Sequence, residues 1–113
     1  MKPGFTYLLT NKSNTTLYIG VTNNIVLRVQ QHRDKIDPKS FTARYNLNKL
    51  VYYEAHQMIG DAIGREKQLK SGNRAQKIAL IEGMNPDWED LFEQAKAEFG
   101  DGSIVNGKKQ SFK

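Results

Sequence analysis

A pair of short β-type segments near the start of the chain constrains the fold most. FTYLLT (5–10) and TTLYIGV (15–21) are rich in aromatic and β-branched residues, and the polar turn cluster NKSN separates them. This pattern predicts a β-hairpin. Because side chains alternate between the faces of a strand, Tyr7 and Tyr18 are expected on one face. The other face is then aliphatic and is expected to be the core face, formed by Leu8, Leu17, Ile19 and Val21.

The segments that follow predict helices and one more strand. A helix is expected to begin at Thr22 or Asn23, whose side-chain oxygens can cap free backbone amides, and to end at DPKSF. KLVYYEA (49–55) is typical of a third strand. An irregular loop is expected over 37–48, and further helices over 57–71, over 73–83 and from Asn85-Pro86 to about Phe99. The chain is therefore expected to be an α/β domain with a small three-stranded antiparallel sheet flanked by helices.

Charge and length narrow the classes of protein further. The formal net charge is +5, from 17 Lys and Arg against 12 Asp and Glu, which favours a polyanion such as nucleic acid as partner. A chain of 113 residues is long enough for one compact domain and too short to argue for two. We expect that domain over residues 1–99. Residues 100–113 are polar, Gly-rich and basic, and are expected to be a disordered tail.

Two absences in the sequence limit the chemistry and the location. The chain has no cysteine, so any bound metal would need oxygen ligands or one of the two histidines, which favours a hard divalent ion. No apolar run approaches the roughly 20 residues that span a bilayer, and Met1 is not followed by a signal-like region. We therefore expect no membrane association and a cytoplasmic location.

Polar residues interrupt the apolar stripes of two predicted helices. Glu66 lies within a stripe formed on a helical wheel by Ile59, Ala62, Ile63, Leu69 and Lys70. Either Glu66 pairs with Lys70 or Arg65 at the margin of this stripe, or it faces a cleft and stays ionised because a cation binds it. In the first helix, Arg28 and His32 lie four residues apart beside a stripe expected to be buried, which comprises Ile25, Val29 and Ile36.

Taken in order, these features resemble the GIY-YIG nuclease superfamily, which includes the UvrC N-terminal nuclease of DNA repair. Tyr7 stands where the first motif ends, although Phe5-Thr6 replace its Gly-Ile, and Tyr18-Ile19-Gly20 is the second motif intact. Arg28 follows Gly20 by eight residues at the position of the superfamily's helix arginine. The segments YIGVTN, FTARYNLNKLVYYEA, AIGREKQLK, KIALIE and NPDWEDL resemble the small single-domain bacterial branch over roughly residues 5–92, while SGN (71–73) departs from it.

The resemblance implies a metal-dependent DNA endonuclease, with a role for each motif residue. Glu66 is expected to hold one Mg²⁺ or Mn²⁺, and Arg28 to offer its planar fork of donors to a nonbridging phosphate oxygen. Tyr7 is expected to act as general base or water-orienting group, with Tyr18 and His32 hydrogen-bonding around the water. A free phenol titrates near 10, so the metal and Arg28 would have to lower its pKa. Gly20 is expected to allow close approach beside Tyr18, because it lacks a Cβ.

Basic residues outside these motifs are expected to contact nucleic acid, and the substrate stays open. The expected contacts are Lys39, Arg44, Lys70 and Arg74, and Lys39 and Arg44 lie in a patch that also holds Phe41 and Tyr45. Asn73 and Asn85 are both left outside the expected catalytic set. Superfamily nucleases usually take specificity from a second DNA-binding domain, so a protein partner is one source of it here. Two alternatives remain: an inactive nucleic-acid-binding or interaction module with the same fold, and an RNA-binding protein.

Overall fold

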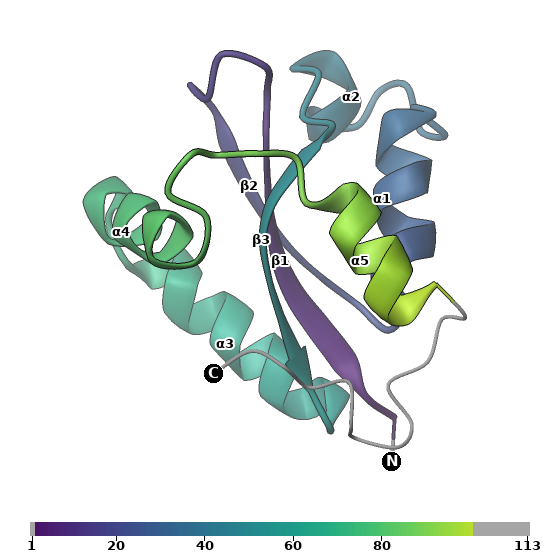
Figure 1. The fold of residues 1–113 in the computed structure, drawn as a ribbon, viewed down its shortest axis with the longest axis vertical. Helices are drawn as coiled ribbons and strands as arrows, with labels where there is room; N and C mark the ends of the chain where they lie inside the picture. The colour runs from purple at the N-terminus through teal and green to yellow at the C-terminus, as the bar shows by residue number, and fades with distance from the viewer. Residues whose placement is uncertain (1, 101–113) are drawn as a thin grey trace.

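The computed structural model describes residues 2–100, which form a three-stranded sheet between two layers of helices (Figure 1). The strands are β1 (Gly4–Thr10), β2 (Leu17–Thr22) and β3 (Lys49–His56), all antiparallel to their neighbours in the order β2-β1-β3. The helices are α1 (Ile25–Arg33), α2 (Phe41–Arg44), α3 (Ile59–Ser71), α4 (Arg74–Met84) and α5 (Phe92–Phe99). The expected α/β class and three-stranded antiparallel sheet are confirmed. Residues 101–113, most of the expected disordered tail, lie outside the described part of the chain.

Both faces of the sheet are buried, so the expectation of one aliphatic core face is wrong. Phe5, Tyr7 and Leu9 of β1 pack with α1 and α5 in the larger core, whereas Leu8 and Ile19 pack with residues of α3 and α4 in a second cluster. Figure 1 shows α1 and α5 on one side of the sheet and α3 and α4 on the other. The face that carries Tyr7 is thus buried as fully as the aliphatic face, because two helices cover each side of the sheet.

A bulge in β3 shifts the register in the middle of the sheet. Leu8 pairs with Tyr52, but Leu9 pairs with Leu50, so Val51 is an extra residue on β3. Val51 and Tyr52 consequently both pack into the second cluster, while Tyr53 returns to the larger core beside Tyr7. The bulge therefore places two consecutive residues on the same face of the sheet, and beyond it the side chains of β3 alternate again, with Tyr53 facing the larger core.

The first helix is shorter than expected and has another cap. The Asn24 side chain accepts a hydrogen bond from the backbone N–H of Leu27, so Asn24 is the N-cap and not Thr22 or Asn23. The helix ends at Arg33, and Lys35 adopts a left-handed backbone conformation with φ of 52°. Ile36 is therefore not in the buried stripe and is 67% exposed. The loop expected over 37–48 contains the short helix α2, which the Ser40 side chain caps.

The helices of the second layer match their expected positions more closely. In α3, Ala62 is fully buried but Ile63 is 41% exposed, so the expected apolar stripe through Ile63 is narrower than the wheel suggests. Asn73 caps α4 through a capping box with Gln76. Within residues 2–100, no helix combines the length and apolar character that crossing a bilayer needs.

Asn85 does not open the last helix, as the Asn-Pro pair suggested, but fixes the loop before it. Its side-chain amide Nδ2 donates to the carbonyls of Val51 (3.2 Å) and Glu89 (2.8 Å), and its Oδ1 accepts from the N–H of Glu89 (3.0 Å). Asn85 is 5% exposed, and α5 begins only at Phe92. The polar side chain holds the 85–91 loop against β3, and the N-cap position of α5 is Leu91 instead.

Candidate active site

Tyr7 occupies the central strand, and its ring crosses the neighbouring strand at a glycine. The side chain is fully buried, and the Cα partner of Tyr7 on β2 is Gly20. A Cβ on Gly20 would lie 2.5 Å from Cζ of Tyr7 and 2.9 Å from Cε2 of Tyr18. Both distances are shorter than any that real Cβ atoms tolerate, so only glycine lets the Tyr7 ring lie across β2. The close approach expected at Gly20 is thus made by the ring of Tyr7.

The Tyr7 hydroxyl is the start of a hydrogen-bonded chain that runs into α1 and α2. Its Oη lies 3.0 Å from Nε2 of His32, and Nδ1 of His32 lies 2.9 Å from Oγ1 of Thr42. Thr42 is 4% exposed and also lies 3.2 Å from Oγ of Ser40, the N-cap of α2. A hydroxyl of Tyr7 that donates to Nε2 requires the tautomer in which Nδ1–H donates to Thr42. Thr42 therefore fixes the ring of His32 from behind.

Tyr18 completes a cluster of three rings. The centroids of Tyr7 and Tyr18 are 6.3 Å apart, and the rings of Tyr18 and His32 meet edge to face at 5.6 Å. Tyr18 comes from β2 and His32 from α1, so the cluster joins the hairpin to the first helix. The structure thus brings together Tyr7, Tyr18, Gly20 and His32, as the motif spacing predicts.

Burial sets the protonation states of the two central groups. Burial raises the pKa of Tyr7 well above its ordinary value, and the neighbouring Tyr18 adds to this, whereas the charge of Arg28 opposes it. The negative charge of Glu66 raises the Tyr7 pKa further. Burial also lowers the pKa of His32, and the charge of Arg28 lowers it further by a smaller amount. At neutral pH the pair is therefore a protonated phenol beside a neutral imidazole, so the expected lowering of the Tyr7 pKa by Arg28 is outweighed by burial.

Glu66 reaches the site from the opposite layer of helices. Its side chain is 20% exposed, and its Oε2 accepts from Nζ of Lys70 at 3.0 Å. Of the two interpretations drawn from the helical wheel, the ion pair with Lys70 is present, and the carboxylate lies near enough to Tyr7 for its charge to raise the pKa of the phenol. Arg65, the next residue, turns instead toward β3.

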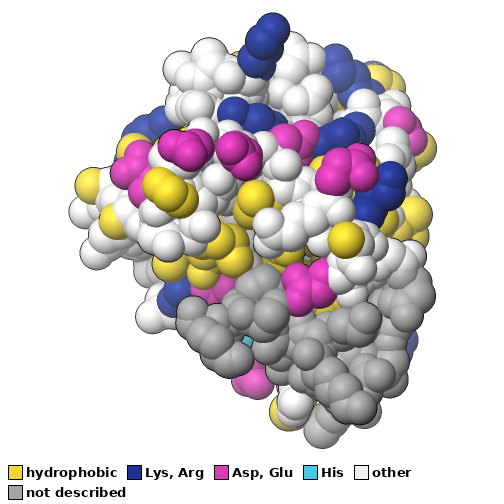
Figure 2. Space-filling model, viewed as in Figure 1, with side chains coloured by type: hydrophobic (Ala, Val, Ile, Leu, Met, Phe, Trp, Pro, Cys, Tyr) yellow, Lys and Arg dark blue, Asp and Glu magenta, His cyan; other side chains and the backbone are white. Residues whose placement is uncertain are grey.

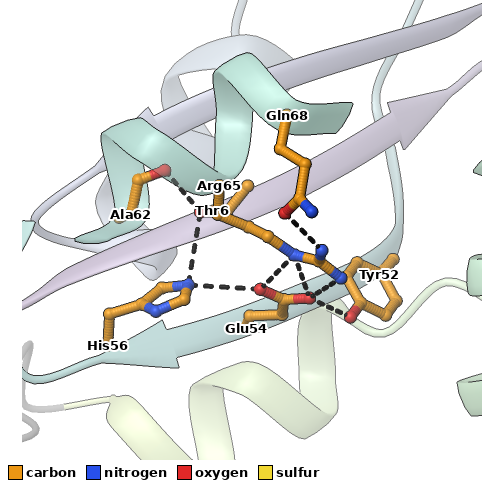
Figure 3. Close-up of polar contacts among 7 residues, drawn as sticks. All are labelled: Thr6, Tyr52, Glu54, His56, Ala62, Arg65 and Gln68. Atoms are coloured by element: carbon orange, nitrogen blue, oxygen red, sulfur yellow. Dashed lines mark hydrogen bonds and ion pairs between the residues drawn. The ribbon is translucent and has the colours of Figure 1, made fainter. Parts of the chain in front are cut away.

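A polar cluster between β3 and α3 fixes the helix that carries Glu66 (Figure 3). Nε of Arg65 donates to both carboxylate oxygens of Glu54, at 3.1 and 3.0 Å, and Oγ1 of Thr6 donates to the carbonyl of Ala62 at 2.9 Å. Although burial alone would raise the pKa of Glu54, hydrogen bonds from Arg65 and Tyr52 hold it below its ordinary range. The cluster thus anchors α3, and with it Glu66, against β1 and β3.

Glu66 is the carboxylate of the site that would hold a hard divalent ion, with water in most of the ion's remaining ligand positions. Among residues 2–100, no three His, Asp or Glu side chains group closely enough to hold a metal ion. Mg²⁺ is commonly bound through one or two carboxylates together with water and substrate phosphates, so a single carboxylate suffices only where a phosphate supplies further oxygens. Glu66 supplies one such carboxylate, paired here with Lys70, so an ion held there would take its other ligands from water and a bound phosphate.

The expected nucleic-acid contacts lie in two places. Lys39 and Arg44 are exposed on either side of Thr42, the residue that holds His32. Lys70 is engaged with Glu66, and Arg74 contacts the carbonyl of Asn14 in the β1–β2 turn at 3.4 Å. Lys39, Arg44 and Lys70 therefore lie next to residues that contact or flank the site, whereas Arg74 is placed at the turn.

Thr42 is the site residue that the sequence analysis missed. It lies ten residues after His32 in a segment expected to be irregular, and no motif marks it. Only the structure shows that Thr42 is buried while Phe41 and Arg44 beside it are exposed. A hollow of about 220 Å³ between α1 and α2 is lined by Arg28, His32, Ser40 and Thr42 among others, and gives access to this part of the site.

Comparisons with known proteins agree with this arrangement. The family described as the GIY-YIG catalytic domain matches residues 3–79, a range that contains all the motif residues. A UPF0213 protein of Syntrophus aciditrophicus is 34% identical over 87 residues, which cover 77% of this chain and 98% of the relative. A UPF0213 protein of Pediococcus pentosaceus is 32% identical over 78 residues, 69% of this chain and 81% of the relative. The solution NMR structure of a UPF0213 protein from Bacillus halodurans shares the fold, with a TM-score of 0.50 and 22% identity over 80% of this chain and 95% of that chain.

Proposed function

The chain belongs to the GIY-YIG family of catalytic domains, and from this premise we propose that it is a metal-dependent endonuclease that hydrolyses DNA phosphodiester bonds. One observation carries the proposal: a buried tyrosine hydroxyl contacts a neutral histidine at 3.0 Å, and the charges of Arg28 and Glu66 both act on that hydroxyl. A proton acceptor, a guanidinium and a carboxylate around one point are the groups that phosphodiester hydrolysis requires.

The protonation states favour a relay in which Tyr7 and His32 act together. Because burial keeps Tyr7 protonated, the phenol cannot start as a free base. In the proposed step, Tyr7 takes a proton from the attacking water and passes its own hydroxyl proton to Nε2 of His32. The hydroxide then attacks phosphorus as the bond to the leaving oxygen breaks. The lowered pKa of His32 keeps Nε2 free of a proton at neutral pH, which this step needs.

Arg28 and Glu66 have separate tasks in this proposal. The planar guanidinium of Arg28 offers two parallel donors to a nonbridging oxygen, whose charge grows as the reaction proceeds. Glu66 is the residue that would hold Mg²⁺ or Mn²⁺, and such an ion stabilises charge on the phosphate and on the leaving oxygen. An ion held by Glu66 would compete with Lys70 for the carboxylate, and Lys70 would then be available to contact the DNA backbone.

A cleavage assay with a matched pair of variants tests the proposal. The pure protein is incubated with supercoiled, branched and single-stranded DNA in Mg²⁺, Mn²⁺ or EDTA. Glu66→Gln keeps the side-chain shape but removes the anionic ligand, so cleavage should fall on the order of 10³-fold while metal-free DNA binding holds or rises. Glu93→Gln on α5 makes the same chemical change at a side chain that is 82% exposed, and should leave the rate unchanged.

The result of this assay also decides between the enzyme and its main alternative. Wild-type cleavage by Glu66→Gln would contradict the single-carboxylate site. If the unmodified protein cleaves no form of DNA with either metal ion but still binds nucleic acid, the inactive binding module replaces the nuclease as the function. We propose DNA as the substrate, and a second protein as the source of substrate specificity.

A further inference from the structure

The short helix α2 buries a polar side chain and leaves aromatic side chains at its two ends exposed, the opposite of an ordinary amphipathic helix. Its polar residue Thr42 and the small Ala43 are buried, whereas the aromatic residues Phe41 and Tyr45 are 47% and 46% exposed. Among residues 2–100, these are the aromatic side chains that remain so exposed. Thr42 points inward because it contacts His32, and the helical spacing then turns Phe41, Arg44 and Tyr45 outward together. Two neighbouring exposed rings form an apolar patch of the kind that marks interaction sites.

The outward face of α2 is a continuous aromatic and cationic surface. The rings of Phe41 and Tyr45 lie 4.8 Å apart between centroids at an angle of 46°, and the guanidinium carbon of Arg44 lies 5.7 Å from the Tyr45 centroid. Both rings are about half exposed, and α2 lies at one end of the molecule (Figure 1). We name these three residues the α2 platform.

Basic side chains outnumber acidic ones near the platform. Lys35 and Lys39 are exposed in the segment that leads into α2 and Arg44 is part of the platform itself, while Asp34 and Asp37 are exposed in the same segment. Figure 2 shows Lys and Arg side chains, with Asp and Glu side chains among them, over the upper part of the molecule, the end at which Figure 1 places α2 and the β1–β2 turn. Aromatic faces among cations match a ligand that alternates π-systems with phosphates, and fit neither an acyl chain nor an acidic peptide as well.

The platform is also joined to the candidate active site. Phe41 directly precedes Thr42, whose Oγ1 contacts His32, and the 220 Å³ hollow beside them is lined by Arg28, His32, Ser40 and Thr42. A phosphate held by Arg28 would thus have its neighbouring nucleotides near α2. In a duplex, base faces are covered by stacking within the helix, so they reach an aromatic side chain only when the nucleotide is unpaired.

We propose that the α2 platform stacks with the base of an unpaired nucleotide next to the phosphate bound at Arg28, so that the preferred substrate has single-stranded character at the cut. This inference deepens the proposed nuclease function and rests on it for the position of the cut. The binding of unpaired strands by the platform does not need catalysis, and it can be tested separately.

Binding in EDTA tests the platform without cleavage. Fluorescence anisotropy compares a labelled single-stranded oligonucleotide with a duplex of the same sequence. Each of Phe41→Ala and Tyr45→Ala should weaken single-strand binding by about 5-fold to 100-fold, the range expected for loss of one base stack, and should affect the duplex far less. Tyr45→Phe keeps the ring and should bind as the unmodified protein does. Leu27→Ala removes an exposed apolar side chain on α1 and serves as the control.

Salt dependence separates stacking from charge. Phe41→Ala should leave the slope of log affinity against log salt unchanged, whereas Arg44→Ala should reduce it by up to about one unit. Equal losses on single-stranded and duplex DNA, or no loss in either aromatic variant with an unchanged melting temperature, would overturn the platform. If the platform variants lose single-strand binding while no DNA is cleaved under any condition, the platform stands and the nuclease function fails.

Discussion

Replacing Gly20 with alanine tests the geometry on which the candidate site depends. The added Cβ would lie 2.5 Å from Cζ of Tyr7 and 2.9 Å from Cε2 of Tyr18, so at least one ring has to move. Tyr7 is fully buried between β2 and the α1–α5 layer and has no free space to move into. We therefore expect overpacking to cost about 1–3 kcal/mol of the free energy of unfolding. The Oη–Nε2 contact of 3.0 Å with His32 should be lost as the ring shifts.

Two measurements check this expectation together. At roughly 4–8 °C per kcal/mol for a domain of this size, the melting temperature should fall on the order of 10 °C. Single-turnover cleavage should fall by about 10²-fold at a temperature where the variant is folded, because a displacement near 1 Å at the reacting groups has that effect. Gly64→Ala in α3 is the control: nothing lies within 4 Å of its added Cβ, so it should stabilise by about 0.5–1 kcal/mol. A Gly20→Ala protein with an unchanged melting temperature and rate would refute the packing argument.

Three further substitutions probe other parts of the structure. His32→Gln should flatten stability between pH 7 and pH 5 in thermal melts, because the lowered folded-state pKa makes the unmodified protein lose stability as pH falls below 6.5. Glu54→Gln should lower stability at neutral pH and flatten the acid limb below pH 4.5, since a carboxyl with a lowered pKa stabilises only while ionised; a parallel limb in both proteins would refute this. Asn85→Ala should cost about 1–3 kcal/mol in urea denaturation, because the carbonyl of Val51 loses its donor, and a loss within error would contradict that.

The fold was predictable where the signals are local. The hairpin, β3 and the helices α3 and α4 follow from alternation, turn clusters and helical stripes within single segments. Whether a sheet face is covered depends on helices far away in the sequence. The alternation of the hairpin therefore does not predict that the face with Tyr7 is buried. Asn85 illustrates the same limit, because its use as a cap or as a bridge to Val51 is decided by where the loop packs.

The candidate site was predictable to the extent that spacing fixes it. Pairing in the hairpin places Gly20 opposite Tyr7, and one helical turn separates Arg28 from His32. These relations follow from strand and helix geometry, so they can be predicted without knowledge of the tertiary fold. Thr42 has no such relation to His32: the contact arises because the 34–40 segment folds back and Ser40 begins a new helix there. The direction of the Tyr7 pKa shift also required the structure, because it depends on how completely the ring is buried.

The residues of the site differ in how far chemistry and stability are coupled. Tyr7 belongs at once to the larger core and to the hydrogen-bonded chain through His32, so the packing that buries it also sets its protonation. Any change that loosens this packing should alter the melting temperature and the reaction together. Glu66 is held by an ion pair to an exposed lysine, a contact that contributes at most about 1 kcal/mol. Its replacement should therefore remove cleavage and leave the fold intact, which makes Glu66 the position at which loss of activity is the cleanest evidence for catalysis.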